Sequence, residues 1–159
     1  MFLPHKINVF LGLTFIASTV VLSLNSCKRS FACHEDNISA AGADESHNMG
    51  QNCMQCHQAK GEGEGCFIAA GTVYGLDMMN TVSSGKVDFY TGPNETGILK
   101  QTIMIDSKGN FYTTADFSPV GLYPVVTGPT GNKKEMASAL TSGACNSCHG
   151  GSTNKLWVD

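Results

Sequence analysis

The stretch LKQTIMIDSKGNFYTT, residues 99–114, decides the fold of this chain. Polar and apolar side chains alternate over residues 99–106, which is the period of a strand with one buried face. Residues 107–110 (SKGN) have the composition of a tight turn, and residues 111–114 (FYTT) are of the aromatic and β-branched kinds that strands prefer. We therefore expect an antiparallel hairpin here.

The middle third of the chain continues this pattern. Further apolar or alternating segments predict strands over residues 67–76 (FIAAGTVYGL), 87–91 (VDFYT) and 122–127 (LYPVVT). Pro124 has no N–H to donate, which favours an edge position for the last of them. Residues 133–142 (KKEMASALTS), followed by Gly143, predict a short helix with a glycine at its C-terminus. The sequence thus predicts a mainly β fold.

The N-terminus has the pattern of an export signal. Residues 9–24 (VFLGLTFIASTVVLSL) carry no charge and follow Lys6, and the run is short for a spanning helix. Residues 24–27 (LNSC) resemble a bacterial lipobox, which predicts cleavage before Cys27 and lipid attachment to its sulfur. An uncleaved anchor helix with an incidental cysteine is the alternative. Either outcome places the rest of the chain in the periplasm or at the cell surface, tethered to a membrane.

Charge narrows the choice of partners. The chain has 10 basic and 13 acidic residues, and cleavage before Cys27 removes Lys6 and no acid, which takes the net charge from −3 to −4. The sequence has no basic patch for nucleic acid, and electrostatic steering would favour a cationic partner. Residues 27–50 are polar and acidic, and we expect them to form a tether.

Seven cysteines are an unusual number for 159 residues. Cys27 is the predicted lipid site, four others form two C-x-x-C pairs, and Cys33 and Cys66 remain. Because disulfides persist outside the cytoplasm, we expect a Cys33–Cys66 bridge that pins the tether to the loop after the first pair. A free thiol or a bridge between two chains is the alternative.

A histidine follows each cysteine pair: residues 53–57 read CMQCH and residues 145–149 read CNSCH. This spacing is that of covalent haem attachment, in which two sulfurs bond to one haem edge and the histidine binds the iron. The sequence therefore predicts two haem c groups. The expected thioether ligands are Cys53, Cys56, Cys145 and Cys148, and the expected proximal iron ligands are His57 and His149.

Two other interpretations of the cysteine pairs are weaker. One tetrahedral zinc ion can use two such pairs, but a histidine directly after both pairs would then be a coincidence. A thioredoxin-like redox pair needs a βαβ setting, which the predicted strands do not supply.

The distal iron ligands are less well defined. We expect His47, six residues before the first motif, at the first haem, and Met136, in the predicted helix before the second motif, at the second haem. His34 and Met49 are the alternates. Methionine in place of histidine raises the reduction potential, so this choice bears on the direction of electron flow.

The segment between the motifs resembles a known module. Its characteristic stretches are, in order, residues 71–74 (GTVY), 87–90 (VDFY), 106–112 (DSKGNFY) and 121–126 (GLYPVV). This order is similar to that of the carboxypeptidase regulatory-like, transthyretin-like β-sandwich family, whose modules are usually structural or adhesive. The resemblance implies a small antiparallel β-sandwich that acts as a scaffold.

We expect three parts: an export signal over residues 1–26, the tether over residues 27–50, and a dihaem domain over residues 51–159 whose sandwich covers about residues 67–131. Short helical or loop segments at both ends of the sandwich would bind the haems, with the two irons close together on one side. The predicted protein is a lipid-anchored dihaem c-type cytochrome and not an enzyme. It would relay electrons from a membrane donor to an external or periplasmic acceptor.

Two alternatives stay open. The sandwich also suits a haem-bearing surface module or filament subunit, which would assemble with further copies of this chain. A small dihaem peroxidase would share both C-x-x-C-H motifs, although such enzymes are much longer and have two helical cytochrome domains.

Overall fold

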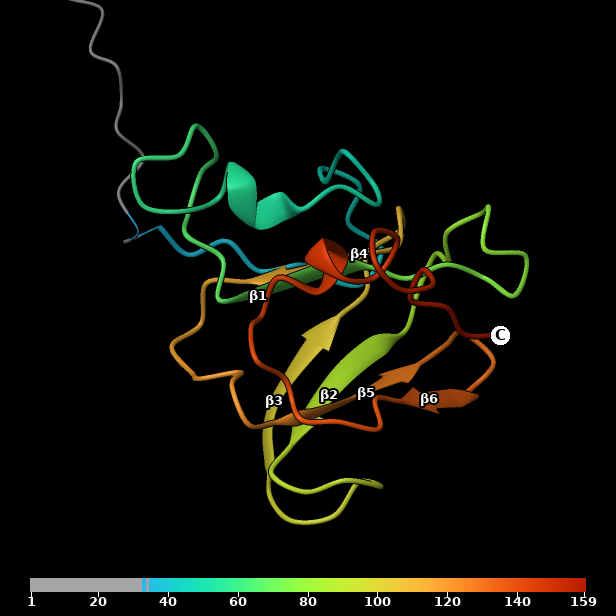
Figure 1. Cartoon of the computed structure of the whole chain (residues 1–159). Helices are drawn as coiled ribbons and strands as arrows, with labels where there is room; N and C mark the ends of the chain where they lie inside the picture. The colour runs from blue at the N-terminus through green and yellow to red at the C-terminus, as the bar shows by residue number, and fades with distance from the viewer. Residues whose placement is uncertain (1–32, 34) are drawn as a thin grey trace, which may run out of the picture.

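A computed structural model describes residue 33 and residues 35–159. The predicted export signal, the lipobox and Cys27 lie outside the described residues. The described chain is mainly β and forms two antiparallel sheets that face each other as a small sandwich, as the sequence predicted (Figure 1). Among the described residues, no helix has the length and apolar character needed to cross a bilayer.

The larger sheet has four strands in the order β3-β2-β5-β6. Their bounds are Lys86–Tyr90 for β2, Leu99–Met104 for β3, Tyr123–Thr127 for β5 and Lys133–Glu135 for β6. Alternation in the sequence has its expected effect, since Val87, Phe89 and Ile103 point into the core and are no more than 1% exposed. This sheet forms the lower layer in Figure 1.

The smaller sheet pairs β1 (Ala69–Thr72) with β4 (Asn110–Thr113). The turn predicted over residues 107–110 is present, because Asp106 Oδ1 accepts the N–H groups of Lys108 and Asn110, each at 2.9 Å. The predicted hairpin is wrong, however, because β3 pairs with β2 and β4 pairs with β1. The buried residues Ile105 and Asp106 carry the chain from one sheet to the other.

Two predictions near the C-terminal end of the sandwich are also wrong. Residues 133–142 form no helix: their first three residues pair with β5 as β6, and the rest is loop. The unpaired edge of β5 outweighs the weak helix propensity of so short a segment. As a result β5 is an inner strand. Pro124 is tolerated because it lies just beyond the β6 pairing, where its carbonyl accepts the Met136 N–H at 3.2 Å.

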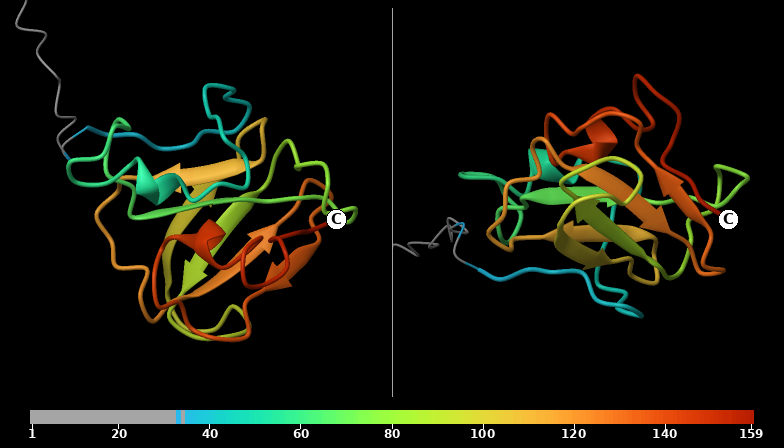
Figure 2. Two further views of the ribbon diagram at one scale, coloured as in Figure 1. Left: turned by 45° about the horizontal axis from the view of Figure 1, so that its top comes forward. Right: turned by 90° about the horizontal axis from the view of Figure 1, so that it is seen from below.

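The segments at both ends of the described chain cover the edges of the smaller sheet. The predicted tether is packed over its described part, since Ser39 is 3% exposed and its N–H bonds to the Tyr112 carbonyl of β4 at 2.9 Å. On the other edge, β1 donates from Ala70 to the Gly143 carbonyl at 2.9 Å. Each segment also carries one of the short 3₁₀ turns, η1 (Cys53–Gln55) and η2 (Cys145–Ser147), and β1 contacts both (Figure 2).

Candidate functional site

Both C-x-x-C-H motifs fold into the same turn. In each motif, the second cysteine and the histidine donate their backbone N–H groups to the carbonyl of the first cysteine. The N···O distances are 3.2 and 3.0 Å in the first motif, and 3.2 and 2.9 Å in the second. The two motifs therefore share one local geometry although they lie far apart in the sequence, and both are placed beside β1.

The histidine of each motif is held through its Nδ1 atom. His57 Nδ1 lies 2.8 Å from the Glu64 carbonyl oxygen, and His149 Nδ1 lies 3.0 Å from the Asn154 carbonyl oxygen. Because a carbonyl can only accept, Nδ1 carries the proton and the lone pair is left on Nε2. This tautomer binds a metal through Nε2 while the carbonyl fixes the ring orientation.

A cavity of about 700 Å³ lies beside the first motif. Cys53, Cys56, His57 and His47 all line it. Its volume is within the range of about 300–1,000 Å³ that is usual for cofactor pockets. The cavity therefore has room for a haem next to the sulfurs and the imidazole that would hold it.

His47, the predicted distal ligand of this site, lies close to His57. The two ring centroids are 6.0 Å apart and the ring planes meet at 34°. Metal–imidazole bonds of about 2 Å on opposite sides of one ion would place two centroids roughly 6 Å apart. The residues at the first motif therefore fit a haem with two histidine ligands.

The surroundings of His57 hold its ring in place. The residue is 9% exposed, and Phe67 stacks on its ring with 4.0 Å between centroids and 8° between planes. The loop after the motif also closes on the ring, because a Cβ at Gly63 would lie only 2.6 Å from Nδ1. Glycine at this position is thus required for the Nδ1 contact with the loop.

The lining of the first cavity is acidic. Five carboxylates take part in it, and among the described residues no lysine or arginine lines it. The acidic residues are Glu35, Asp36, Glu45, Glu62 and Glu64. Negative charge around a redox centre stabilises its more positive, oxidised state, and it would attract a cationic partner to this face.

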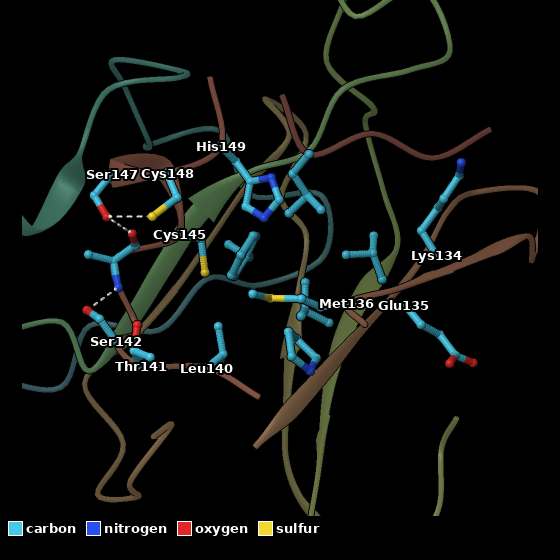
Figure 3. Close-up of a pocket in the computed structure, with 16 residues that line it drawn as sticks. Lys134, Glu135, Met136, Leu140, Thr141, Ser142, Cys145, Ser147, Cys148 and His149 are labelled. Carbon is cyan, nitrogen blue, oxygen red and sulfur yellow. Dashed lines mark hydrogen bonds between the residues drawn. The ribbon is translucent and has the colours of Figure 1, made fainter. Parts of the chain in front are cut away.

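The second motif borders a smaller and more apolar cavity of about 120 Å³. Figure 3 shows the Met136 side chain and the His149 ring pointing into it beside Cys145. Met136 thus reaches the predicted place from the loop after β6 rather than from a helix. The donor set fits a haem with histidine and methionine ligands. The enclosed volume is below that of usual cofactor pockets, so a haem here would lie partly in solvent.

The thiols differ in their exposure. Cys145 is 9% exposed, whereas Cys148 and Cys56 are exposed. Burial raises the pKa of the Cys145 thiol to about 12, and burial also raises the pKa of the Cys53 thiol. A raised pKa keeps a thiol protonated at neutral pH, so the first cysteine of each motif is expected to be the less reactive thiol of its pair.

The other predicted site residues are placed as follows. Cys33 and Cys66, the pair left over in the sequence, form a disulfide, which ties the start of the described chain to the loop after the first motif. Met49 is 46% exposed and does not line either cavity. His34 lies outside the described residues. Within the described chain, no group of three or more His, Cys, Asp or Glu residues is arranged to hold a bare metal ion.

Several residues of these sites were not predicted from the sequence. They are the carbonyl partners Glu64 and Asn154, the stacked Phe67, and a set of buried polar side chains between the motifs. The Gly/Glu-rich loop over residues 60–65 was the only local signal, since a glycine-rich loop directly after a C-x-x-C-H motif is placed to fold back onto it. The other contacts join residues far apart in the sequence.

No family model matches the chain, and comparisons with curated proteins and with solved structures find no match either. The similarity to transthyretin-like modules therefore rests on the short stretches quoted above and stays a prediction.

Proposed function

We propose that this chain is an exported dihaem c-type cytochrome, lipid-anchored through Cys27, which carries electrons at the cell envelope. The observation that carries the proposal is the duplicated geometry of the C-x-x-C-H turns. Both cysteines of each motif lie within one turn, and each histidine is held at Nδ1 so that Nε2 is free.

The two sites differ in their distal residues. His47 supports a bis-histidine site at the first motif, and Met136 supports a histidine–methionine site at the second. Methionine ligation raises the potential of a haem, and the carboxylates around the first cavity favour the oxidised state there. We therefore propose that the first site has the lower potential and that an electron shared between the sites resides mainly on the second.

The chain's own residues have clear tasks in such a carrier. They hold the imidazoles in fixed orientations, keep water from the face of His57 with Phe67, and set the charge around each site. The haem would supply the one-electron chemistry. We propose redox proteins as partners: a donor at the membrane and an external or periplasmic acceptor, of which one with a cationic surface would dock at the acidic first cavity.

The test is a haem count on the full chain, expressed with haem-maturation machinery and measured by haem staining and pyridine haemochrome spectra. We expect two haems per chain. The paired variants C53S/C56S and C145S/C148S should each retain one, because each removes the sulfurs of one motif. A wild-type chain with no covalent haem, or with only one haem, would contradict the proposal.

The anchor is tested separately. Mass spectrometry of the N-terminal peptide of the membrane-bound protein should show a chain that begins at Cys27 with acyl groups on that residue. A peptide that still contains residues 1–26 without acylation would replace the lipid by an uncleaved anchor helix in this proposal.

A further inference from the structure

A buried polar network lies between the two motifs, and neither haem attachment nor core packing explains it. Thr72, Asn110 and Asn146 form it and are 0%, 2% and 8% exposed. Thr72 Oγ1 donates to Asn110 Oδ1 at 2.6 Å and accepts from Asn146 Nδ2 at 3.0 Å. Asn146 Oδ1 in turn accepts the Thr72 backbone N–H at 3.0 Å. Asn146 is itself one of the two residues between the cysteines of the second motif.

The network reaches the loop that carries His47. Asn146 Nδ2 donates to the Gln51 carbonyl at 2.8 Å. Asn110 Nδ2 donates to the His47 carbonyl at 3.2 Å and to Ser46 Oγ at 3.0 Å. The same loop donates from the Gly50 N–H to Thr72 Oγ1 at 2.9 Å. Every member of the network therefore holds the loop over residues 46–51.

This loop has few other anchors. His47, Asn48, Met49 and Gln51 are all exposed, so little apolar burial fixes its position. Outside the network, Lys108 Nζ donates to the Ser46 carbonyl at 3.0 Å, at the start of the loop. The position of the His47 ring opposite His57 thus depends mainly on hydrogen bonds from residues 72, 110 and 146.

The amides of Asn110 and Asn146 also have no spare donor. Asn146 uses Nδ2 twice and Oδ1 once, and Asn110 does the same. A largely buried amide whose N–H groups are all engaged loses free energy when one of its partners moves away. A shift of the turn at the second C-x-x-C-H motif would therefore also displace the loop that carries His47.

We propose that Asn146, within the second C-x-x-C-H motif, is a positioning residue for the first site: it holds the 46–51 loop so that His47 faces His57. The inference rests on the proposed function for the identity of the group that both histidines bind. It means that the two sites are coupled through side chains of the protein, and that attachment at the second motif helps to complete ligation at the first.

The experiment replaces Asn146 with leucine in the full chain and uses Ser147→Ala as the matched control. Ser147 is the other middle residue of the same motif, but it is exposed, and its hydroxyl bonds only within its own turn, to the Ala144 carbonyl at 2.6 Å and to Cys148 Sγ at 3.9 Å. After a haem count of two is verified, the spin state of each haem is read by electron paramagnetic resonance, and carbon monoxide binding is measured on the reduced protein.

We expect Asn146→Leu to release His47, which turns the first haem partly high-spin and open to carbon monoxide while the second motif keeps its haem. Loss of the three side-chain hydrogen bonds of Asn146, one of them directly to the loop, should raise the released fraction by about tenfold or more. Ser147→Ala should match the wild type. His47→Ala gives the reference spectrum for a fully released ligand.

Asn110→Ala should release His47 in the same way. Because Asn110 lies outside both motifs, this variant keeps the test valid if Asn146→Leu reduces haem attachment at the second motif. Wild-type spectra for a fully loaded Asn146→Leu would overturn the proposal, and so would a change confined to the second haem. Either result would leave the proposed dihaem function standing, whereas a haem-free wild type would remove that function first.

Discussion

Replacing Thr72 with valine tests the buried network at its centre. The Thr72 hydroxyl makes three hydrogen bonds: it donates to Asn110 and accepts from Asn146 and from the Gly50 N–H, at 2.6, 3.0 and 2.9 Å. Its side chain is fully buried against the second motif and the 46–51 loop. Valine keeps the shape and removes all three bonds at once.

The magnitude follows from those bonds. Each costs about 1 kcal/mol net when lost, and a buried partner left unpaired costs about 1–3 kcal/mol. The Asn110 and Asn146 amides keep their Nδ2 bonds to the 46–51 loop, but Asn110 Oδ1 loses its only partner, so we expect the total to be at least about 3 kcal/mol. That is a large share of the roughly 5–15 kcal/mol that stabilises a typical domain.

Urea denaturation of the two variants Thr72→Val and Thr127→Val, at equal haem content, measures the effect. Thr127 is the matched control because its Oγ1 is buried with no hydrogen-bond partner among the described residues. Its replacement by valine should leave the free energy of unfolding unchanged or raise it slightly. Equal stabilities for Thr72→Val, Thr127→Val and the wild type would refute the network as a structural element.

Three further predictions follow from the sites. His47→Ala should open the first haem to carbon monoxide, seen as a new ferrous–carbonyl spectrum for half of the haem; an unchanged spectrum would remove His47 as a ligand. Met136→Leu should lower the potential of one haem in a redox titration and abolish the charge-transfer band of methionine ligation, whereas the exposed Met104→Leu should do neither. In the haem-free chain, Cys148 should be alkylated by iodoacetamide faster than the buried Cys145, as peptide mass spectrometry would show, because the raised pKa of Cys145 leaves little thiolate.

The strands were predictable because their signals are local. Alternation over residues 87–91 and 99–106 needs only a buried and an exposed face, and the structure has strands in both places. The pairing partner of each strand, in contrast, is not determined by local sequence. The hairpin expected over residues 99–114 failed because the chain changes sheets at Ile105 and Asp106, and nothing in the turn sequence shows which sheet each flanking strand joins.

The candidate sites also combine features that the local sequence predicts with contacts that only the fold creates. The C-x-x-C-H spacing is enough to predict the cysteines and histidines as haem ligands, because covalent attachment would need those residues within one turn. His47 was predictable only as a nearby spare histidine, and its distance from His57 required the folded loop. The Thr72, Asn110 and Asn146 contacts span 38 to 74 residues of sequence, so only the packing of both chain ends on one sheet brings them together.

That packing has a physical cause. A two-stranded sheet is marginal by itself, and its open edges leave N–H groups unpaired. On one edge of β1, the N–H groups of Ala70 and Thr72 donate to the Gly143 carbonyl and Asn146 Oδ1, and just beyond the strand the Tyr74 N–H donates to the Leu156 carbonyl. Thus the segment around the second motif completes the sheet, with Asn146 acting where a strand carbonyl would stand. The same hydrogen bonds that place the two motifs beside β1 therefore also stabilise the sandwich. A change in the fold at this edge would change the distance between the two sites.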